Sequence, residues 1–205
     1  MHLCYGELIK IAAVFFECII APGYSDDALA VLQQKKNIRL LQWPENWQVS
    51  SRDKWDIKKI SGGLLLQEVD RSTESYSQWQ LKSGKGVTAV NELEFTWKMV
   101  KHVKSNAIVL VKNGQLIGVG AGQMSRVDSV QIAISKAKEF GFDLMGAVLA
   151  SDAFFPFADS IETSGAEGIS TIIEPGGSVR DEEVIEAANR LNLTLYFTGV
   201  RHFKH

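Results

Sequence analysis

Apolar residues recur along this chain with two spacings, one typical of helices and one typical of strands. In the first third, Ser25 is suited to cap a helix over residues 26–35, whose apolar residues recur on one face. The other elements predicted in this third are a helix-to-strand run over 11–21, a strand over 37–42 and a strand pair within 57–69. Residues 43–56 and 71–86 are polar and lack periodicity, so we expect both to be surface connections.

The second half of the chain is more regular and begins with a helix and a hairpin. Helical spacing predicts a helix over 90–104, with a mainly apolar face formed by Leu93, Trp97, Val100 and Lys104. Asn113-Gly114 accepts the positive φ angles of a two-residue turn, and it lies between two apolar runs. This pattern predicts a hairpin of strands 107–111 and 115–119.

Strands and helices alternate through the rest of the chain. Ser125 and Asp128 have the spacing of a capping pair at the start of a helix over 125–140. The elements predicted after it are a strand over 147–150, a short helix after Pro156, a strand over 169–173, a helix over 181–191 and a strand over 194–198. This alternation predicts an α/β fold, with a mixed sheet flanked by helices. The regular core is expected over 87–205, and residues 1–70 form a first segment and linker.

Composition and charge restrict the classes of function. A chain of 205 residues that is 45% hydrophobic can fill one core, which excludes disorder as the main state. Its 22 Lys and Arg balance 24 Asp and Glu, so no field of one sign attracts nucleic acid or a membrane surface. The apolar run 11–21 is shorter than the roughly 20 residues that span a bilayer. Cys4 and Cys18 lack zinc-site spacing, and we expect a reduced, cytoplasmic protein that binds small molecules or protein.

Three loops follow predicted strands, and ligands collect beyond strand ends in open α/β sheets. Loop 118–126 is rich in glycine, and its backbone N–H groups and Arg126 can receive phosphate or carboxylate, unless the glycines only permit a tight turn. Loop 151–159 carries three phenylalanines that either fill the core or stack on a planar ring. Loop 174–180 is either a simple turn or part of the same site. The basic tail 201–205 is either solvated or held at this edge.

Several stretches of the sequence, in one order, resemble a known enzyme family. They are IIAPGYSDDAL, ISGGLLLQEVD, VKSNAIVLVKNGQLIGVGAGQMSR, ASDAFFPFADS, EPGGSVRDEEVIEAA and TGVRHFKH. Over nearly its whole length the chain is similar to the C-terminal part of the bifunctional purine-synthesis enzymes, which combine aminoimidazole carboxamide ribonucleotide (AICAR) formyltransferase with inosine monophosphate (IMP) cyclohydrolase. The resemblance implies a cytidine-deaminase-like layered fold without the deaminase zinc, whose H-x-E and P-C-x-x-C motifs are absent from this sequence. It also implies that the cyclohydrolase domain and the upstream formyltransferase subdomain lie outside this chain.

The resemblance implies a reaction and a set of site residues. Members of this family transfer the formyl group of 10-formyltetrahydrofolate to the weakly nucleophilic amine of AICAR during IMP synthesis, which requires positioning, a base and stabilisation of an oxyanion. Carried over by motif, the nucleotide-side residues are Asn106, Arg126, Phe154 and Arg201. The folate-side residues are Val127, Asp159, Ser178 and Val179. A potassium ion is implied near Ser105 and Asp152.

The catalytic Lys-His pair of the family lies upstream, in a K-H-V-S-P-A-G-type stretch that this sequence does not contain. Lys101-His102-Val103 repeats three of its letters but belongs to the helix before Ser105-Asn106, so no catalytic residue is assigned in this chain. We therefore expect a chain that binds nucleotide and folate and is incomplete for catalysis, with Lys and His supplied by a homodimer partner or by the missing half. The alternatives are an inactive fragment that binds nucleotide or folate weakly, and a fragment that only dimerises.

Overall fold

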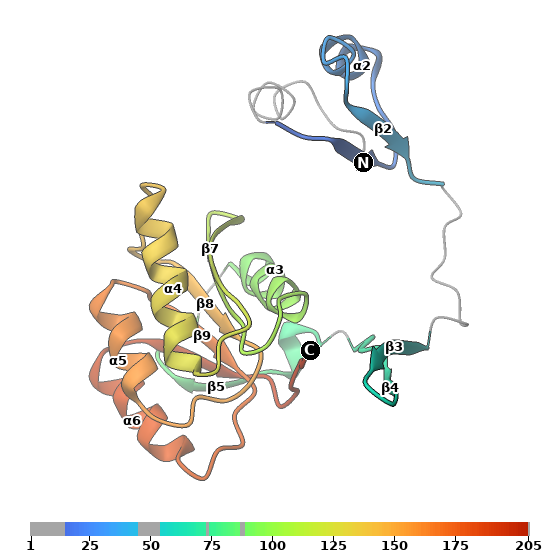
Figure 1. Ribbon diagram of the computed structural model, residues 1–205. Coiled ribbons are helices and arrows are strands. Elements are labelled where there is room, and N and C mark those ends of the chain that lie inside the picture. The colour runs from blue at the N-terminus through green and yellow to red at the C-terminus, as the bar shows by residue number, and fades with distance from the viewer. Residues whose placement is uncertain (1–14, 45–53, 73, 87–88, 205) are drawn as a thin grey trace. The chain divides into compact units, whose positions relative to one another are not determined.

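The computed structural model describes residues 15–44, 54–72, 74–86 and 89–204 (Figure 1). The chain divides into two compact units, Met1–Val69 and Asp70–His205. The larger unit contains a six-stranded sheet with helices on both faces, whereas the described part of the smaller unit contains two separate two-stranded sheets.

The six-stranded sheet of the larger unit is mixed, as the sequence predicts. Its strands are β5 (Gln80–Ser83), β6 (Ile108–Lys112), β7 (Gln115–Gly120), β8 (Val148–Ser151), β9 (Thr171–Glu174) and β10 (Thr194–Phe197). Across the sheet their order is β5-β10-β9-β8-β6-β7. Strands β8, β9 and β10 are parallel, while β6 runs antiparallel to β7 and β8, and β5 runs antiparallel to β10. The predicted α/β class with a mixed sheet flanked by helices is therefore confirmed.

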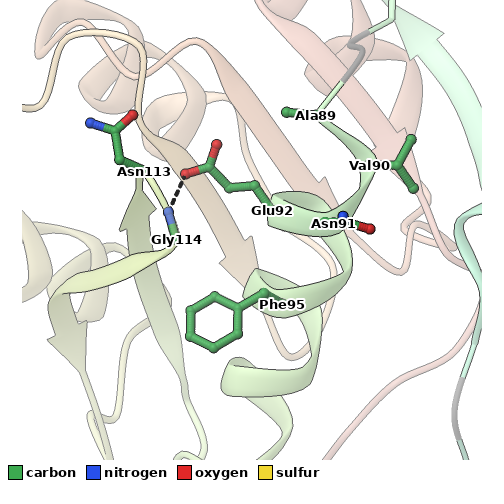
Figure 2. A pocket seen from close by; sticks show the side chains of 7 residues that line it. All are labelled: Ala89, Val90, Asn91, Glu92, Phe95, Asn113 and Gly114. Atoms are coloured by element: carbon green, nitrogen blue, oxygen red, sulfur yellow. Dashed lines mark hydrogen bonds between the residues drawn. The ribbon is translucent and has the colours of Figure 1, made fainter. Parts of the chain in front are cut away.

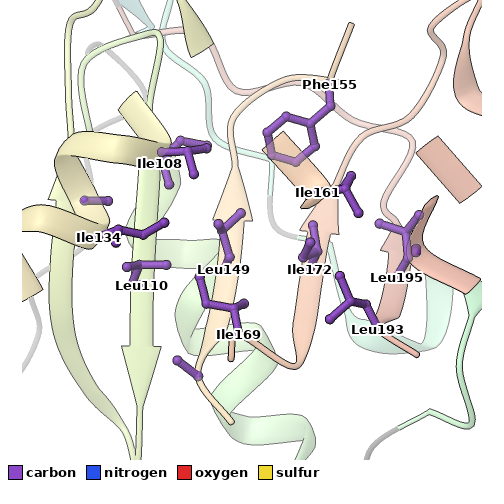
Figure 3. Close-up of a cluster of buried hydrophobic side chains, with 14 of the residues drawn as sticks. Ile108, Leu110, Ile134, Leu149, Phe155, Ile161, Ile169, Ile172, Leu193 and Leu195 are labelled. Carbon is purple, nitrogen blue, oxygen red and sulfur yellow. The ribbon is translucent and has the colours of Figure 1, made fainter. Parts of the chain in front are cut away.

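Helices cover both faces of this sheet because its central strands are apolar on both faces. The helices are α3 (Val90–Lys101) on one face and α4 (Arg126–Glu139), α5 (Asp159–Ala166) and α6 (Asp181–Arg190) on the other (Figure 1). In β6, Ile108 and Leu110 pack with α4, α5 and α6, whereas Val109 packs with α3. Figure 3 shows the first of these cores, in which Phe155 lies over the strands beside Ile161. The second core, under α3, is rich in aromatic residues, including Trp79, Trp97 and Tyr196.

The local signals of the second half are mostly confirmed. Asn113 and Gly114 have φ angles of 54° and 71°, and they connect β6 to β7 as the predicted hairpin. Helix α3 ends at Lys101 rather than 104, because the N–H of Val103 turns back to the carbonyl of Val100. The predicted capping pair is wrong, since the side chain of Ser125 makes no capping hydrogen bond at the start of α4.

The prediction of a surface connection over residues 71–86 is also wrong. This stretch contains a 3₁₀ helix, η1 (Tyr76–Gln78), and strand β5, which forms one edge of the central sheet. Two of the four side chains of this short edge strand are exposed, and the strand needs no alternation of apolar residues, so periodicity does not reveal it. Trp79, between these two elements, is buried in the second core.

The smaller unit is built from local pairings. Strand β1 (Cys18–Ala21) runs parallel to β2 (Arg39–Gln42), and helix α2 (Asp26–Leu32) connects them. The predicted cap is confirmed, because the side chain of Ser25 accepts the N–H of Ala28 at 3.2 Å. The predicted strand pair within 57–69 is confirmed as a hairpin of β3 (Trp55–Ile60) and β4 (Gly63–Glu68), so β3 begins inside the expected connection 43–56.

Some of the early predictions fall outside the described residues. These are the start of the run 11–21, most of the connection 43–56, and Cys4, whereas Cys18 is described and is an exposed free thiol. Among the described helices, none has the length and apolar character needed to cross a bilayer.

Candidate functional site

The strand directions bring five chain segments to one edge of the central sheet. Strands β8, β9 and β10 are parallel, and β7 points the same way because both β7 and β8 are antiparallel to β6. The loops that follow these four strands therefore leave the sheet at the same edge. Residues 105–106 lie there too, because they directly precede β6. The three loops singled out in the sequence thus share this edge with the C-terminal tail.

A buried ionic cluster forms the inner part of this edge. Arg126, the first residue of α4, is only 9% exposed and forms an ion pair with Asp152, which has no exposed surface. The same guanidinium donates to Oγ of Ser151 at 3.0 Å and to Oδ1 of Asn106 at 2.8 Å. A buried pair of this kind is costly to break from one side, because the remaining charge has no partner. The fold therefore fixes the position of this guanidinium.

Asn106 is held from several sides. Its side-chain Nδ2 donates to the carbonyl of Gln123 at 2.9 Å and to that of Met124 at 3.2 Å. Its own backbone carbonyl accepts the hydroxyl of Ser129 at 2.8 Å. These bonds join the start of β6 to the glycine-rich loop and to the first turns of α4. Asn106 and Arg126, two of the nucleotide-side residues implied by the resemblance, are thus in direct contact.

The other two implied nucleotide-side residues form a second pair nearer the solvent. The guanidinium carbon of Arg201 lies 4.6 Å from the centre of the Phe154 ring, a cation–π geometry. Phe154 is half-buried and Arg201 is exposed. The two pairs are connected through the backbone, because the N–H of His202 donates to the carbonyl of Asp152 at 3.0 Å. All four residues therefore lie at one edge rather than on unrelated faces.

The basic tail is held in place rather than solvated over its described residues. The N–H of Ser105 donates to the carbonyl of Lys204 at 2.9 Å, and His202 is only 1% exposed. The two ring nitrogens of His202 face carboxylates, Asp70 at 2.5 Å and Glu74 at 3.0 Å. Burial by itself raises the pKa of Asp70, but hydrogen bonds from Ser72 and His202 outweigh it and lower that pKa to about 2.

Two glycines of loop 118–126 are required by packing. A Cβ atom on Gly118 would lie 2.4 Å from the carbonyl oxygen of Ala133, and one on Gly120 would lie 1.9 Å from that of Ser129. Both glycines lie in β7 and let the backbone of α4 approach this strand closely. Close packing of β7 on α4 is thus a role for these two glycines that neither interpretation of the sequence, an anion site or a tight turn, includes.

The folate-side residues lie on the loop before α6, at the start of α5 and on α4. Ser178 and the fully exposed Val179 belong to the loop before α6, which Asp181 fixes by accepting the N–H groups of Gly177 at 2.7 Å and Ser178 at 2.8 Å. Asp159 is exposed at the start of α5. Within the described ranges, no hydrogen bond or ion pair joins Val127 to these residues.

A model of the AICARFT/IMPCHase bienzyme family matches residues 7–136 of this chain, which is more than half of its length. The chain belongs to this family. It is 50% identical to the bifunctional purine biosynthesis protein PurH of Aquifex aeolicus over 98% of this chain and 39% of that protein. The corresponding PurH of Chloroflexus aurantiacus is 48% identical over 100% of this chain and 40% of that protein. The chain therefore spans about two fifths of the length of these AICARFT/IMPCHase relatives.

Among solved structures, the dCMP deaminase of the cyanophage S-TIM5 aligns with 53% of this chain and 98% of its own, at 13% identity and a TM-score of 0.39.

Ser105 and Asp152, near which the resemblance implies a potassium ion in this AICARFT/IMPCHase chain, already bind other groups of the protein. The hydroxyl of Ser105 donates to one carboxylate oxygen of Asp152, and the guanidinium of Arg126 occupies the other. Each oxygen of this carboxylate therefore accepts a hydrogen bond from the protein itself, and the potassium ion stays a prediction. Groups of three or more His, Cys, Asp or Glu that could hold a metal are absent from the described residues. We assign no step to a cation here.

A pocket of about 450 Å³ lies at the other end of β6, away from the nucleotide-side residues. Figure 2 shows it between the start of α3 and the hairpin turn, where the carboxylate of Glu92 accepts the N–H of Gly114 at 3.0 Å. A second cavity of about 450 Å³ borders the candidate site, and its walls include Lys82, Gly177 and Arg201.

Sequence reasoning missed the carboxylates that hold the tail. Asp70 and Glu74 flank a stretch that lacks periodicity, and they lie 132 and 128 positions before His202. Lys101 binds in the same place, to the carbonyl of Ser72 at 2.5 Å, whereas its neighbour His102 is exposed. No local pattern relates these residues, because the sheet brings together the two ends of the larger unit.

Proposed function

We propose that this chain is the C-terminal part of an AICAR formyltransferase, and that the sheet edge around Arg126 and Arg201 binds AICAR and 10-formyltetrahydrofolate. In this function a formyl group is transferred to the amine of AICAR during IMP synthesis. The family membership supports the proposal. The observation that carries it is the meeting of Asn106, Arg126, Phe154 and Arg201 from four separate segments at one edge.

The geometry suggests how these residues divide the binding of the nucleotide. Arg201 is exposed and stacks on Phe154, so its N–H edge is available to a carboxamide or phosphate oxygen. Arg126 uses its guanidinium inside the protein, where it neutralises Asp152 and orients the side-chain amide of Asn106. We therefore assign direct anion binding mainly to Arg201, and the positioning of Asn106 to Arg126.

The reaction requires more than these residues supply. The AICAR amine attacks the formyl carbon, a C–N bond forms, the tetrahedral oxyanion collapses, and the folate nitrogen leaves and takes up a proton. General acid–base catalysis is worth about 10²–10⁴-fold in such steps. The Lys-His stretch implied by the resemblance is not in this sequence, so we expect binding without appreciable turnover by this chain alone.

The alternative is an inactive fragment of the same enzyme that binds a protein partner. The observation favouring it is the set of exposed apolar side chains on the β3–β4 hairpin, which includes Ile57, Leu64 and Leu66. An isolated two-stranded hairpin is marginally stable in water. In this alternative the hairpin is covered by a second copy or by the missing half.

Calorimetric titration with AICAR tests the proposal. We expect saturable binding by the unmodified chain and its loss in Arg201→Ala. Arg190→Ala is the matched control, because that arginine forms an exposed ion pair with Glu162 on the helical face. Absence of binding by the folded chain at millimolar AICAR would refute the proposal in favour of the fragment. An absorbance assay for formyl transfer should show no turnover, and ordinary turnover would mean that this chain has its own base.

A further inference from the structure

Glu174 is a buried acid at the candidate site that no part of the proposed reaction uses. It is the last residue of β9 and has no exposed surface. Its Oε2 accepts the N–H of Phe155 at 2.6 Å, and its Oε1 is buried without a hydrogen-bond partner among the described residues. A buried carboxylate with an unpaired oxygen is unfavourable, because the charge loses its hydration and gains only one hydrogen bond.

The surroundings of Glu174 favour its neutral form. Burial has the largest effect and raises the pKa of Glu174, and the carboxylate of Asp181 on α6 raises it further. The N–H of Phe155 and the guanidinium of Arg126 on α4 lower this pKa. The net result is a rise to about 8. The side chain is therefore a neutral carboxylic acid at pH 7, and it becomes a buried anion only in alkaline solution.

Glu174 contacts the loop that carries Phe154 and begins the loop that lies beside Arg201. Through its side chain it fixes the peptide that follows Phe154. Through its backbone it begins the loop that contains Gly177, whose carbonyl lies 3.5 Å from the guanidinium of Arg201. One buried group thus connects the loop under the ring to the loop beside the arginine.

We propose that Glu174 is a positioning residue, whose neutral side chain keeps the Phe154 loop in the geometry that binds nucleotide, and that ionisation of Glu174 releases this loop. The nucleotide part of this inference rests on the proposed function. The physical reason for release is hydration. The side chain has no exposed surface, so water reaches a charged Oε1 only when a covering segment moves, and we assign this movement to the Phe154 loop, which is bonded to the same carboxyl group.

The substitution Glu174→Gln removes the ionisable group and keeps the size of the side chain. Glutamine has the same size and keeps a carbonyl oxygen for the N–H of Phe155, but it cannot ionise. Glu162→Gln is the control, since Glu162 is exposed on α5 and paired with Arg190. All three forms of the full chain are compared at pH 7 and pH 9.

Amide hydrogen exchange of residues 152–158 is the first readout, and it needs no ligand. At pH 7 we expect equal exchange in the unmodified chain and both variants. At pH 9 we expect faster exchange in the unmodified chain and in Glu162→Gln than in Glu174→Gln. Equal exchange of all three forms at pH 9 would overturn the proposal, because ionisation would then leave the loop in place.

AICAR titration is the second readout. If only the neutral form of Glu174 binds, affinity falls in proportion to the neutral fraction, which gives a loss of about tenfold at pH 9 that Glu174→Gln does not show. An equal loss in both proteins would overturn the link between Glu174 and the nucleotide. If no form binds AICAR at either pH, the proposed function fails, and hydrogen exchange still decides whether Glu174 holds the loop.

Unfolding by urea at pH 5 and pH 8 reports the ionisation itself. The pKa of Glu174 is raised in the folded chain from its ordinary value of 4.5 to about 8. Its contribution to stability is therefore complete below about pH 4.5 and is lost as the pH rises toward 8. We expect stability to decrease less over this interval in Glu174→Gln. The same decrease in both proteins would mean that Glu174 is already charged at pH 7, which would overturn the proposal.

Discussion

The two halves of the candidate site differ in how much of the protein holds them. Arg126 and Asp152 are buried, and each has several partners from different strands and loops. Phe154 and Arg201 lie nearer the solvent, and their mutual contact is a single cation–π pair. The buried half is therefore part of the core, and its geometry is fixed before any ligand arrives. The outer half has fewer side-chain contacts, and we propose that it contributes mainly to binding.

The largest expected effect on stability comes from removing the buried guanidinium of Arg126. In Arg126→Ala, Asp152 keeps its burial and loses its counter-charge, so we expect unfolding free energy to fall by about 3–5 kcal/mol. Urea denaturation measures the change. Arg190→Ala breaks an exposed pair and should cost no more than about 1 kcal/mol. Equal effects of the two substitutions would show that the inner half is no more structural than the surface.

The second test concerns the packing of α4, which carries Arg126, against strand β7. Gly120→Ala would place a methyl group 1.9 Å from the carbonyl oxygen of Ser129, so strand and helix must separate. Overpacking of this kind costs about 1–3 kcal/mol, measured by urea denaturation. Gly63→Ala is the control, because no atom lies within 4 Å of its added methyl group. An unchanged stability in Gly120→Ala would mean that α4 is not tightly held against β7.

Substitutions in the outer half should lower the affinity for AICAR more than they lower the free energy of unfolding. In Phe154→Leu the chain loses the ring under Arg201, a contact worth about 1 kcal/mol, so we expect AICAR affinity to fall about fivefold. Phe157→Leu removes a similar ring, 4.8 Å from the guanidinium of Arg180, and serves as the control. Calorimetry measures both. If the control loses as much affinity as Phe154→Leu, the nucleotide does not distinguish the two rings.

The smallest expected effect concerns the tail that carries Arg201. The folded-state pKa of Asp70 is lowered from 3.8 to about 2, so its stabilisation is present above about pH 4 and is lost as the pH falls toward 2. Asp70→Asn should therefore show a smaller decrease in melting temperature than the unmodified chain between pH 5 and pH 2. Identical profiles would mean that the contact with His202 contributes nothing to stability.

Sequence reasoning recovers the features that are encoded locally. The hairpin at Asn113-Gly114 and the cap at Ser25 depend on residues a few positions apart, and both are confirmed. Strand β5 is not predicted, because its pairing with β10 joins residues more than a hundred positions apart and its four residues show no apolar alternation.

The candidate site shows the same division. Periodicity and the parallel strands explain why loops 118–126, 151–159 and 174–180 meet at one edge. Which residues in them bind nucleotide follows only from the family resemblance and stays a prediction. The carboxyl group of Glu174 looks in the sequence like an ordinary strand end, and only the structure reveals its missing partner.

The pairing of β5 with β10 has a consequence for biosynthesis. Strand β5 is the first strand of the larger unit to be synthesised, and it pairs with β10, the last. Strand β10 lies between β5 and β9. Until Thr194–Phe197 has emerged from the exit tunnel, β5 has no neighbour in the sheet and Trp79 lacks the ring of Tyr196 against which it packs. In a nascent chain this sheet can therefore close only after residues 194–197 have been synthesised.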